Sequence, residues 1–169
     1  ESLREHGVTR RGFLKFCAAT ASMMALPPTM ASAIAAALEK ARRPSVIWLS
    51  FQECTGCTES LTRSHSPTVE NLILDVISLD YHHTLQAASG DAAEEARLAA
   101  MKENWGSYLV VVDGSLPGPG SNMGYSTIAG HSNLDILKET VAGAAAVVAV
   151  GTCAAFGGLP RAFPNPTGA

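Results

Sequence analysis

The sequence of 169 residues predicts an α/β fold in which an open parallel β-sheet carries helices on both faces. Three observations support this prediction. Short apolar segments rich in β-branched residues alternate with helix-like segments from residue 45 onward, these apolar segments hold few polar residues, and glycine or cysteine follows three of them closely. Such runs are typical of strands buried on both sides, and their alternation with helices favours parallel pairing.

Four strands and two helices are predicted in order along the chain. The strands occupy residues 46–49, 72–79, 108–112 and 145–150, and the helices occupy residues 91–104 and 133–141. Acidic residues near the start of the first helix and Lys102 near its end suit the helix dipole, and Ser132 is placed to cap the second helix. Among open α/β sheets, the flavodoxin-like winding is our first choice.

The cysteines stand where this architecture binds its ligands, which is beyond the carboxyl ends of the strands. Cys54 and Cys57 follow the first predicted strand, a glycine-rich segment (113–117) follows the third, and Cys153 follows the fourth. We therefore expect all three segments to open onto one edge of the sheet.

The N-terminal residues 1–37 are predicted to be a twin-arginine signal peptide. Arg10 and Arg11 precede a weakly apolar stretch (16–26), and small residues suited to signal peptidase follow at 31–33 or 35–37. The stretch is shorter than the ~20 residues of a membrane-spanning helix. The alternative is an amphipathic helix that happens to contain two arginines. The twin-arginine route carries folded proteins, so the cysteines of the exported domain (38–169) could receive a metal before export.

The ends and the charge of the chain add two expectations. The last residues, 164–169, read as a loop, so we expect this chain to be the N-terminal part of a longer protein. A net charge of −3, with 16% charged residues, gives no indication of nucleic-acid binding.

Three kinds of site suit the cysteines that remain after loss of the signal. Cys54 and Cys57 alone could form a thioredoxin-like redox pair, which leaves Cys153 unexplained. Zinc would need a histidine beside three thiolates. The candidates are His65, His82, His83 and His131, of which His82 and His83 follow the second predicted strand and are expected at the surface. A 4Fe–4S cluster needs four thiolates, one more than this chain supplies.

Four motifs, in order along the chain, resemble the small subunit of nickel–iron hydrogenases. They are ECTGCTES (53–60), DGSLP (113–117), GTCAAFGG (151–158) and PNPT (164–167). The twin-arginine leader is similar to that of the exported, membrane-associated uptake branch of this family. A related cluster-bearing subunit of respiratory complex I shares the fold, but it typically has adjacent cysteines and no export leader.

The resemblance implies an electron-transfer role. Cys54, Cys57 and Cys153 would bind the proximal 4Fe–4S cluster, with the fourth ligand beyond Ala169 and the medial and distal clusters in a missing C-terminal part. The nickel–iron centre would belong to a separate large subunit, so no catalytic residue is expected here. Electrons would leave toward a membrane cytochrome or a quinone-linked acceptor, at the periplasmic face of the cytoplasmic membrane.

The resemblance also assigns four other positions. Glu53 and Asp113 would be carboxylates of a proton route or of cluster tuning, although the family usually has glutamate at the position of Asp113. Oxygen-tolerant relatives carry extra cysteines where this chain has Gly56 and Gly158. An oxygen-sensitive type is therefore expected.

Overall fold

The computed structural model describes residues 9–23, 27, 30–33, 43–118 and 125–169. The chain divides into two units, residues 1–42 and residues 43–169. In the first unit, α2 (Arg10–Met23) begins after Thr9, whose Oγ1 accepts a hydrogen bond from the Gly12 N–H at 3.1 Å. Among the described helices, none has the length and apolar character needed to cross a membrane. The expected cleavage site at residues 35–37 lies outside the described residues.

The second unit is built on four parallel strands. They are β1 (Ser45–Ser50), β2 (Ser78–His82), β3 (Tyr108–Asp113) and β6 (Ala144–Val150), and they lie in the order β2-β1-β3-β6. This order matches the first four strands of a flavodoxin-like sheet. The predicted α/β fold with a parallel sheet is confirmed.

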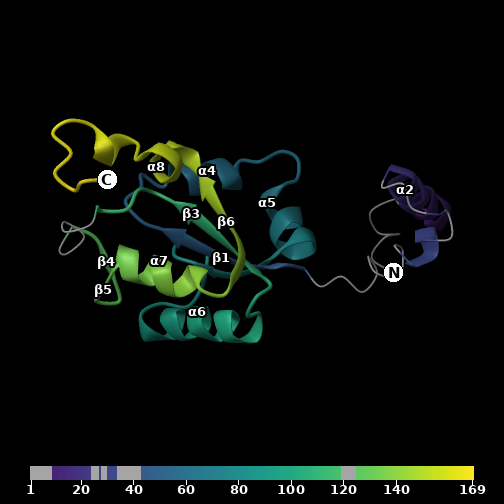
Figure 1. Cartoon of the computed structure of the whole chain (residues 1–169), viewed down its shortest axis with the longest axis horizontal. Helices are drawn as coiled ribbons and strands as arrows, with labels where there is room; N and C mark the ends of the chain where they lie inside the picture. The colour runs from purple at the N-terminus through teal and green to yellow at the C-terminus, as the bar shows by residue number, and fades with distance from the viewer. Residues whose placement is uncertain (1–8, 24–26, 28–29, 34–42, 119–124) are drawn as a thin grey trace. The chain divides into compact units, whose positions relative to one another are not determined.

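One face of the sheet is covered by α6 (Asp91–Glu103) and α7 (Asn133–Val141), which lie below the strands in Figure 1. Ser132 caps α7 as predicted, because its Oγ accepts a hydrogen bond from the Asp135 N–H at 3.2 Å. Alternate strand residues and both helices form one buried apolar cluster, which includes Ile47, Leu49, Tyr81, Met101, Tyr108, Val110, Val112 and Ile136.

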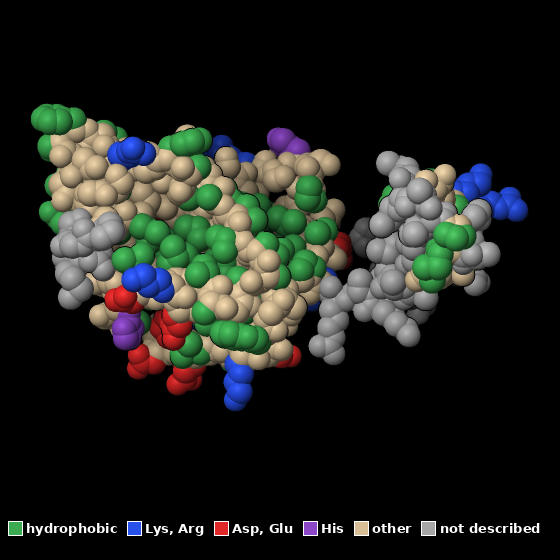
Figure 2. Space-filling model, in the orientation of Figure 1, with side chains coloured by type: hydrophobic (Ala, Val, Ile, Leu, Met, Phe, Trp, Pro, Cys, Tyr) green, Lys and Arg blue, Asp and Glu red, His purple; other side chains and the backbone are tan. Residues whose placement is uncertain are grey.

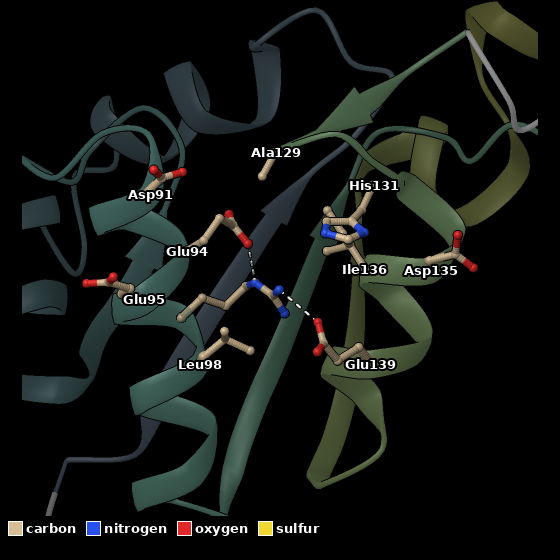
Figure 3. A pocket seen from close by; sticks show the side chains of 10 residues that line it. Asp91, Glu94, Glu95, Leu98, Ala129, His131, Asp135, Ile136 and Glu139 are labelled. Carbon is tan, nitrogen blue, oxygen red and sulfur yellow. Dashed lines mark hydrogen bonds and ion pairs between the residues drawn. The ribbon is translucent and has the colours of Figure 1, made fainter.

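A buried arginine joins α6 to α7. Arg97 has a side chain only 4% exposed, and its guanidinium lies 2.9 Å from Glu94 Oε2 and 2.8 Å from Glu139 Oε2. Figure 3 shows both carboxylates pointing into the space between the two helices. Tyr81 donates from the sheet to Glu94 Oε1 at 2.6 Å. Because a buried charge is costly without partners, this network fixes the two helices to each other and to β2.

The opposite face of β1 and β2 packs against α4 (Gly56–Thr62). Trp48 is 7% exposed, and its ring lies beside the His82 ring with centroids 5.2 Å apart. The buried Thr58 of α4 meets the same histidine, with Oγ1 3.4 Å from Nε2. Helices therefore contact both faces of the sheet.

The second predicted strand was placed too early. Residues 69–76 form α5 (Val69–Asn71) and a π-helical turn, η1 (Leu72–Val76), and β2 starts only at Ser78. Arg43 donates to the carbonyls of Ile73 and Leu74 and so holds this turn in place.

Strand β2 extends beyond the apolar residues 72–79 because the polar residues within it have hydrogen-bond partners. Asp80 accepts hydrogen bonds from the Ser45 and Ser78 hydroxyls. The expectation that His82 lies at the surface was therefore wrong: it ends β2 and is 0% exposed.

The remaining described elements are short. A hairpin of β4 (Thr127–Ile128) and β5 (His131–Ser132) precedes α7, and α8 (Gly151–Phe156) and η2 (Leu159–Arg161) follow β6.

The edge strand β6 is unusually open. Its residues are all Ala or Val, yet residues 145–149 are exposed, with Val147 52% and Val148 46% accessible. Figure 2 shows hydrophobic side chains gathered over this part of the sheet. A parallel strand is normally covered on both faces, so β6 has the composition of a buried strand in an uncovered position.

Candidate metal centre

Two short helices bring the three cysteines to the carboxyl edge of the sheet. Cys54 lies in the loop between β1 and α4, and Cys57 lies in the first turn of α4. Cys153 lies on α8, which follows β6. Figure 1 shows these helices side by side at that edge. Cys57 Sγ lies 3.7 Å from the Val150 carbonyl oxygen, 93 residues away in sequence. The predicted convergence of these segments on one edge is confirmed.

A glycine stands beside each of the three thiols. A Cβ at Gly56 would lie 3.1 Å from Cys54 Sγ, at Gly151 2.5 Å from Cys57 Sγ, and at Gly158 2.4 Å from Cys153 Sγ. The backbone thus passes close to every sulfur; an added side chain would crowd the sulfur at Gly151 and Gly158 and would fit only tightly at Gly56. Close backbone of this kind suits an anionic group that needs N–H donors nearby.

The loop after β3 is held against the loop after β1. Gln52 and Ser115 exchange two backbone hydrogen bonds of 3.1 and 2.9 Å. Gly114, with φ of +79°, passes so near that a Cβ there would lie 2.8 Å from the Gln52 backbone. Glycine is therefore required at this turn, which fixes the position of the first cysteine loop.

A cavity of ≈ 250 Å³ opens between Cys54 and Cys153. It is also lined by Gln52, Glu53, Leu159 and Pro160. Among the described residues, no three His, Cys, Asp or Glu side chains are grouped to hold a single metal ion. Cys54 and Cys153 instead stand on either side of a larger space, and this arrangement fits a polynuclear cluster better than a mononuclear site.

Negative charge collects at this edge. Burial raises the pKa of the Cys57 thiol, and the neighbouring Asp113, Cys153, Cys54 and Glu53 raise it further. Three thiolates would repel one another here without a cation. An iron–sulfur core, whose iron ions bind thiolates directly, would relieve that repulsion.

Two carboxylates accompany the thiols. Asp113 ends β3 and is 0% exposed, and neither of its oxygens has a hydrogen-bond partner among the described residues. Glu53 lines the cavity, and burial followed by the charge of Asp113 raises its pKa. Glu53 Oε1 accepts a hydrogen bond from the Thr55 hydroxyl at 3.3 Å, so Asp113 is the carboxylate whose burial without a partner is costly here.

The candidate zinc histidines are not gathered with the cysteines into a single-ion site. His65 and His131 are exposed, on a loop and on β5. His82 uses both ring nitrogens in contacts with Thr58, Thr84 and Leu85. His83 lies edge-on to Tyr81, with ring centroids 5.1 Å apart.

A second, wider hollow of ≈ 530 Å³ lies between α6 and α7 (Figure 3). Its wall is acidic, with Asp91, Glu95 and Asp135 beside the two carboxylates that hold Arg97. Those carboxylates already serve the ion pairs between the helices, so this hollow carries structural contacts.

Comparisons with known proteins agree with the geometry. Residues 54–169 match the family described as NADH ubiquinone oxidoreductase, 20 Kd subunit. The Hydrogenase-2 small chain of Escherichia coli (strain K12) is 46% identical over 99% of this chain and 45% of its own length. The Periplasmic NiFe hydrogenase small subunit 1 of Nitratidesulfovibrio vulgaris is 48% identical over 100% of this chain and 53% of its own.

A solved structure gives the same result. The recombinant NiFeSe hydrogenase from Desulfovibrio vulgaris Hildenborough aligns with a TM-score of 0.71 and 40% identity, over 77% of this chain and 47% of that one. The chain spans about half the length of the curated relatives it matches. These relatives are hydrogenase subunits, and they give no support to the thioredoxin-like alternative.

The chain belongs to the family described as NADH ubiquinone oxidoreductase, 20 Kd subunit, and it is similar to the N-terminal part of nickel–iron hydrogenase small subunits.

Proposed function

We propose that this chain is the N-terminal part of the electron-transfer subunit of a nickel–iron hydrogenase. Cys54, Cys57 and Cys153 hold the proximal 4Fe–4S cluster, together with a fourth cysteine outside this chain. When bound, the cluster supplies a one-electron carrier. The observation that carries the proposal is the convergence of three thiols, each beside a glycine, at one edge of the sheet, where Cys54 and Cys153 line a cavity and Cys57 Sγ lies 3.7 Å from the Val150 carbonyl oxygen.

The chain's own residues bind and shield the cluster. The three thiolates would be its ligands, and the backbone at Gly56, Gly151 and Gly158 approaches the sulfurs closely. Glu53 and Asp113 act as carboxylates of a proton route or of cluster tuning. The nickel–iron centre would lie on a partner large subunit, and the cluster held by Cys54, Cys57 and Cys153 would supply electron transfer between that centre and the medial and distal clusters expected in the C-terminal part.

The partner docks on the apolar rim of the site. Three large hydrophobic side chains are exposed at or just beyond α8: Phe156 at 73%, Leu159 at 82% and Phe163 at 99%. Leu159 also lines the cavity beside Cys54 and Cys153. Exposed apolar groups around a binding site are typical of an interface, and obligate interfaces bury ~2,000 Å² or more.

The export and acceptor assignments belong to the same proposal. Residues 1–37 are a twin-arginine signal recognised by the translocation machinery, and residues 38–169 are the exported domain at the periplasmic face of the membrane. One relative is named periplasmic, and another, from Wolinella succinogenes, is named quinone-reactive. These names support a membrane cytochrome or a quinone-linked acceptor.

The test is iron and acid-labile sulfide analysis of the full-length subunit co-purified with its large subunit. Cys153→Ser should remove about four iron atoms per complex, since one thiolate of a cubane is lost. Cys17→Ser, a matched change in the signal region, should leave the iron content unchanged. A Cys153→Ser complex that retains all its iron and its proximal-cluster signal would exclude the proposed ligand set.

The oxygen-sensitive subtype has its own test. Because Gly56 and Gly158 supply no further thiolate, the proximal cluster should undergo a single reversible one-electron step. Redox titration of the complex, followed by electron paramagnetic resonance, measures this directly. A second reversible oxidation at high potential would contradict the subtype.

A further inference from the structure

We propose that His82 is a positioning residue for the Cys57 thiolate, which it holds in place through Thr58. This inference rests on the proposed function, since it concerns the protein's hold on the same cluster. Its subject is a contact between Thr58, the buried residue of α4 next to Cys57, and His82, the last residue of β2.

The hydrogen bonds of His82 define its tautomer. Its Nδ1 accepts from the backbone N–H groups of Thr84 at 3.1 Å and Leu85 at 3.4 Å. A ring nitrogen that accepts carries no hydrogen, so the neutral ring has its hydrogen on Nε2. Nε2 therefore donates to Thr58 Oγ1, 3.4 Å away.

The ring is held in this orientation from several sides. It is 0% exposed, and Trp48 of the neighbouring strand lies against it with an angle of 34° between the ring planes. The backbone on either side is fixed as well, because Gln86 N–H donates to the His82 carbonyl at 3.1 Å. The Nε2–H thus points in a direction set by β1, β2 and the turn that follows.

Thr58 is the point at which α4 is fixed to the sheet. It is the buried residue of this seven-residue helix, at 3% exposure, and it directly follows Cys57. Cys57 Sγ on the same helix also contacts the Val150 carbonyl oxygen at 3.7 Å, whereas the Arg63–Glu59 pair lies at the surface, with side chains 79% and 58% exposed. The Thr58–His82 contact fixes the backbone next to Cys57, so it helps to set the direction of the Cys57 side chain beside that residue's own contact with Val150.

Loss of this contact should loosen the protein's hold on the cluster. Partners outside the first layer of metal ligands orient those ligands, and removing one typically costs about 10–100-fold in metal affinity or activity. Thr58→Val deletes the hydroxyl with little change of shape, and Thr58→Ser keeps it. His82→Phe keeps a ring against Trp48 but removes both hydrogen-bonding nitrogens.

The experiment follows iron loss to a chelator from the assembled full-length complex. Thr58→Val and His82→Phe should each speed iron loss about 10-fold. The double variant should be no faster than the faster single variant, and Thr58→Ser should stay within about twofold of the parent. The electron paramagnetic resonance spectrum of the proximal cluster should change in the first three variants and not in the last.

Thr62→Val is the matched control, since Thr62 lies on the same helix but is exposed and donates only to the Glu59 carbonyl. If Thr58→Val behaves like Thr62→Val, or if the effects of the two single changes add in full, the positioning role of His82 is wrong. Should His82→Phe fail to assemble, the Thr58→Val and Thr58→Ser pair still decides. Cluster loss in Cys153→Ser with no effect of Thr58→Val would overturn this inference alone and leave the proposed function standing.

Discussion

Gly151 stands where β6 passes into α8, and its missing side chain leaves room for the Cys57 thiol. Its φ is +77°, and an added Cβ would lie 2.5 Å from that sulfur. Gly106 has a similar φ of +81° but nothing within 4 Å of its Cβ position. Substituting each glycine by alanine therefore distinguishes the cost of a positive φ, which both share, from crowding of the Cys57 sulfur, which occurs only at Gly151.

Gly106→Ala should lower the free energy of unfolding by about 1–2 kcal/mol, which is the cost of a left-handed residue with a side chain. Gly151→Ala should cost more and, under the proposed ligand set, should also lower the iron content of the complex, because the methyl group displaces the Cys57 sulfur. Urea unfolding and iron analysis measure the two effects. Equal iron content in both variants would contradict the crowding argument.

The buried histidines make stability depend on pH. Burial is the main cause that lowers the pKa of both His82 and His83. In the unfolded chain, histidine takes up a proton near pH ~6.5, whereas the folded chain resists it until a lower pH. The stabilisation from keeping these histidines neutral is therefore fully present above the pKa of the unfolded chain. It is lost as the pH falls from about 6.5 toward the lower pKa values of the folded chain.

The free energy of unfolding measured between pH 7 and pH 5 tests this, because its slope against pH gives the number of protons taken up on unfolding. His82→Phe should reduce the uptake on unfolding by up to about one proton. Glu94 does not interfere: although burial raises its pKa, hydrogen bonds from Tyr81 and Arg97 bring it below 4.5, so it acts at lower pH. An undiminished uptake in His82→Phe would show that this histidine is protonated in the folded chain.

Residue by residue, the sequence indicates some parts of the site better than others. Cysteines at the ends of predicted strands can be found from spacing alone. Thr58 and His82 could not be paired in this way, because their contact spans 24 positions and depends on β2 reaching residue 82. The structural feature that explains the pairing is that β2 extends to His82, since Asp80 within it accepts a hydrogen bond from Ser45 of β1.

Among the elements, the β4–β5 hairpin has a turn that its sequence suits poorly. Ala129 and Gly130 occupy the turn with φ of +51° and +79°. Two-residue hairpin turns with positive φ at both positions strongly favour Asn-Gly over Ala-Gly. The strain at Ala129 is local and lies far along the chain from the cysteines.

Ala129→Asn should therefore raise the free energy of unfolding by about 0.5–1 kcal/mol, since asparagine tolerates this backbone shape better. Ala129→Val should lower it, because β-branched residues are least suited to positive φ. Urea unfolding of the chain gives both values. Stabilisation by valine would show that the turn takes another shape in solution.

The error at residues 72–79 also belongs to the scale of elements. An apolar run can pack either as a strand or as a helical turn, and its composition does not distinguish the two. Here the carbonyls of η1 bind Arg43, which precedes β1, and this contact between distant residues decides the outcome. The strands at β1, β3 and β6 were predictable because each is bounded closely by polar or glycine-containing segments.

For the whole second unit, the open strand β6 governs how the chain behaves in isolation. An exposed, apolar edge strand presents unpaired backbone groups to any other chain. The isolated chain of 169 residues should therefore self-associate. Val148→Lys should reduce that association with little change in stability, since Val148 is already 46% exposed.

Light scattering of the purified chain at several concentrations measures this prediction. Leu74→Lys is the control, because Leu74 is 67% exposed on η1, away from the strand. Equal association of the Val148→Lys variant and the parent would mean that β6 is not the surface involved.

The tight space beside Cys153 bears on how oxygen tolerance could be acquired. Gly158 has a φ of +55°, and a Cβ there would lie 2.4 Å from the sulfur. A Gly158→Cys change would therefore displace the Cys153 sulfur, a proposed cluster ligand, before it could supply a new one. The loop would first have to follow a different path, so under the proposed oxygen-sensitive subtype the backbone shape at Gly158, as well as the residue identity, would oppose a further thiolate.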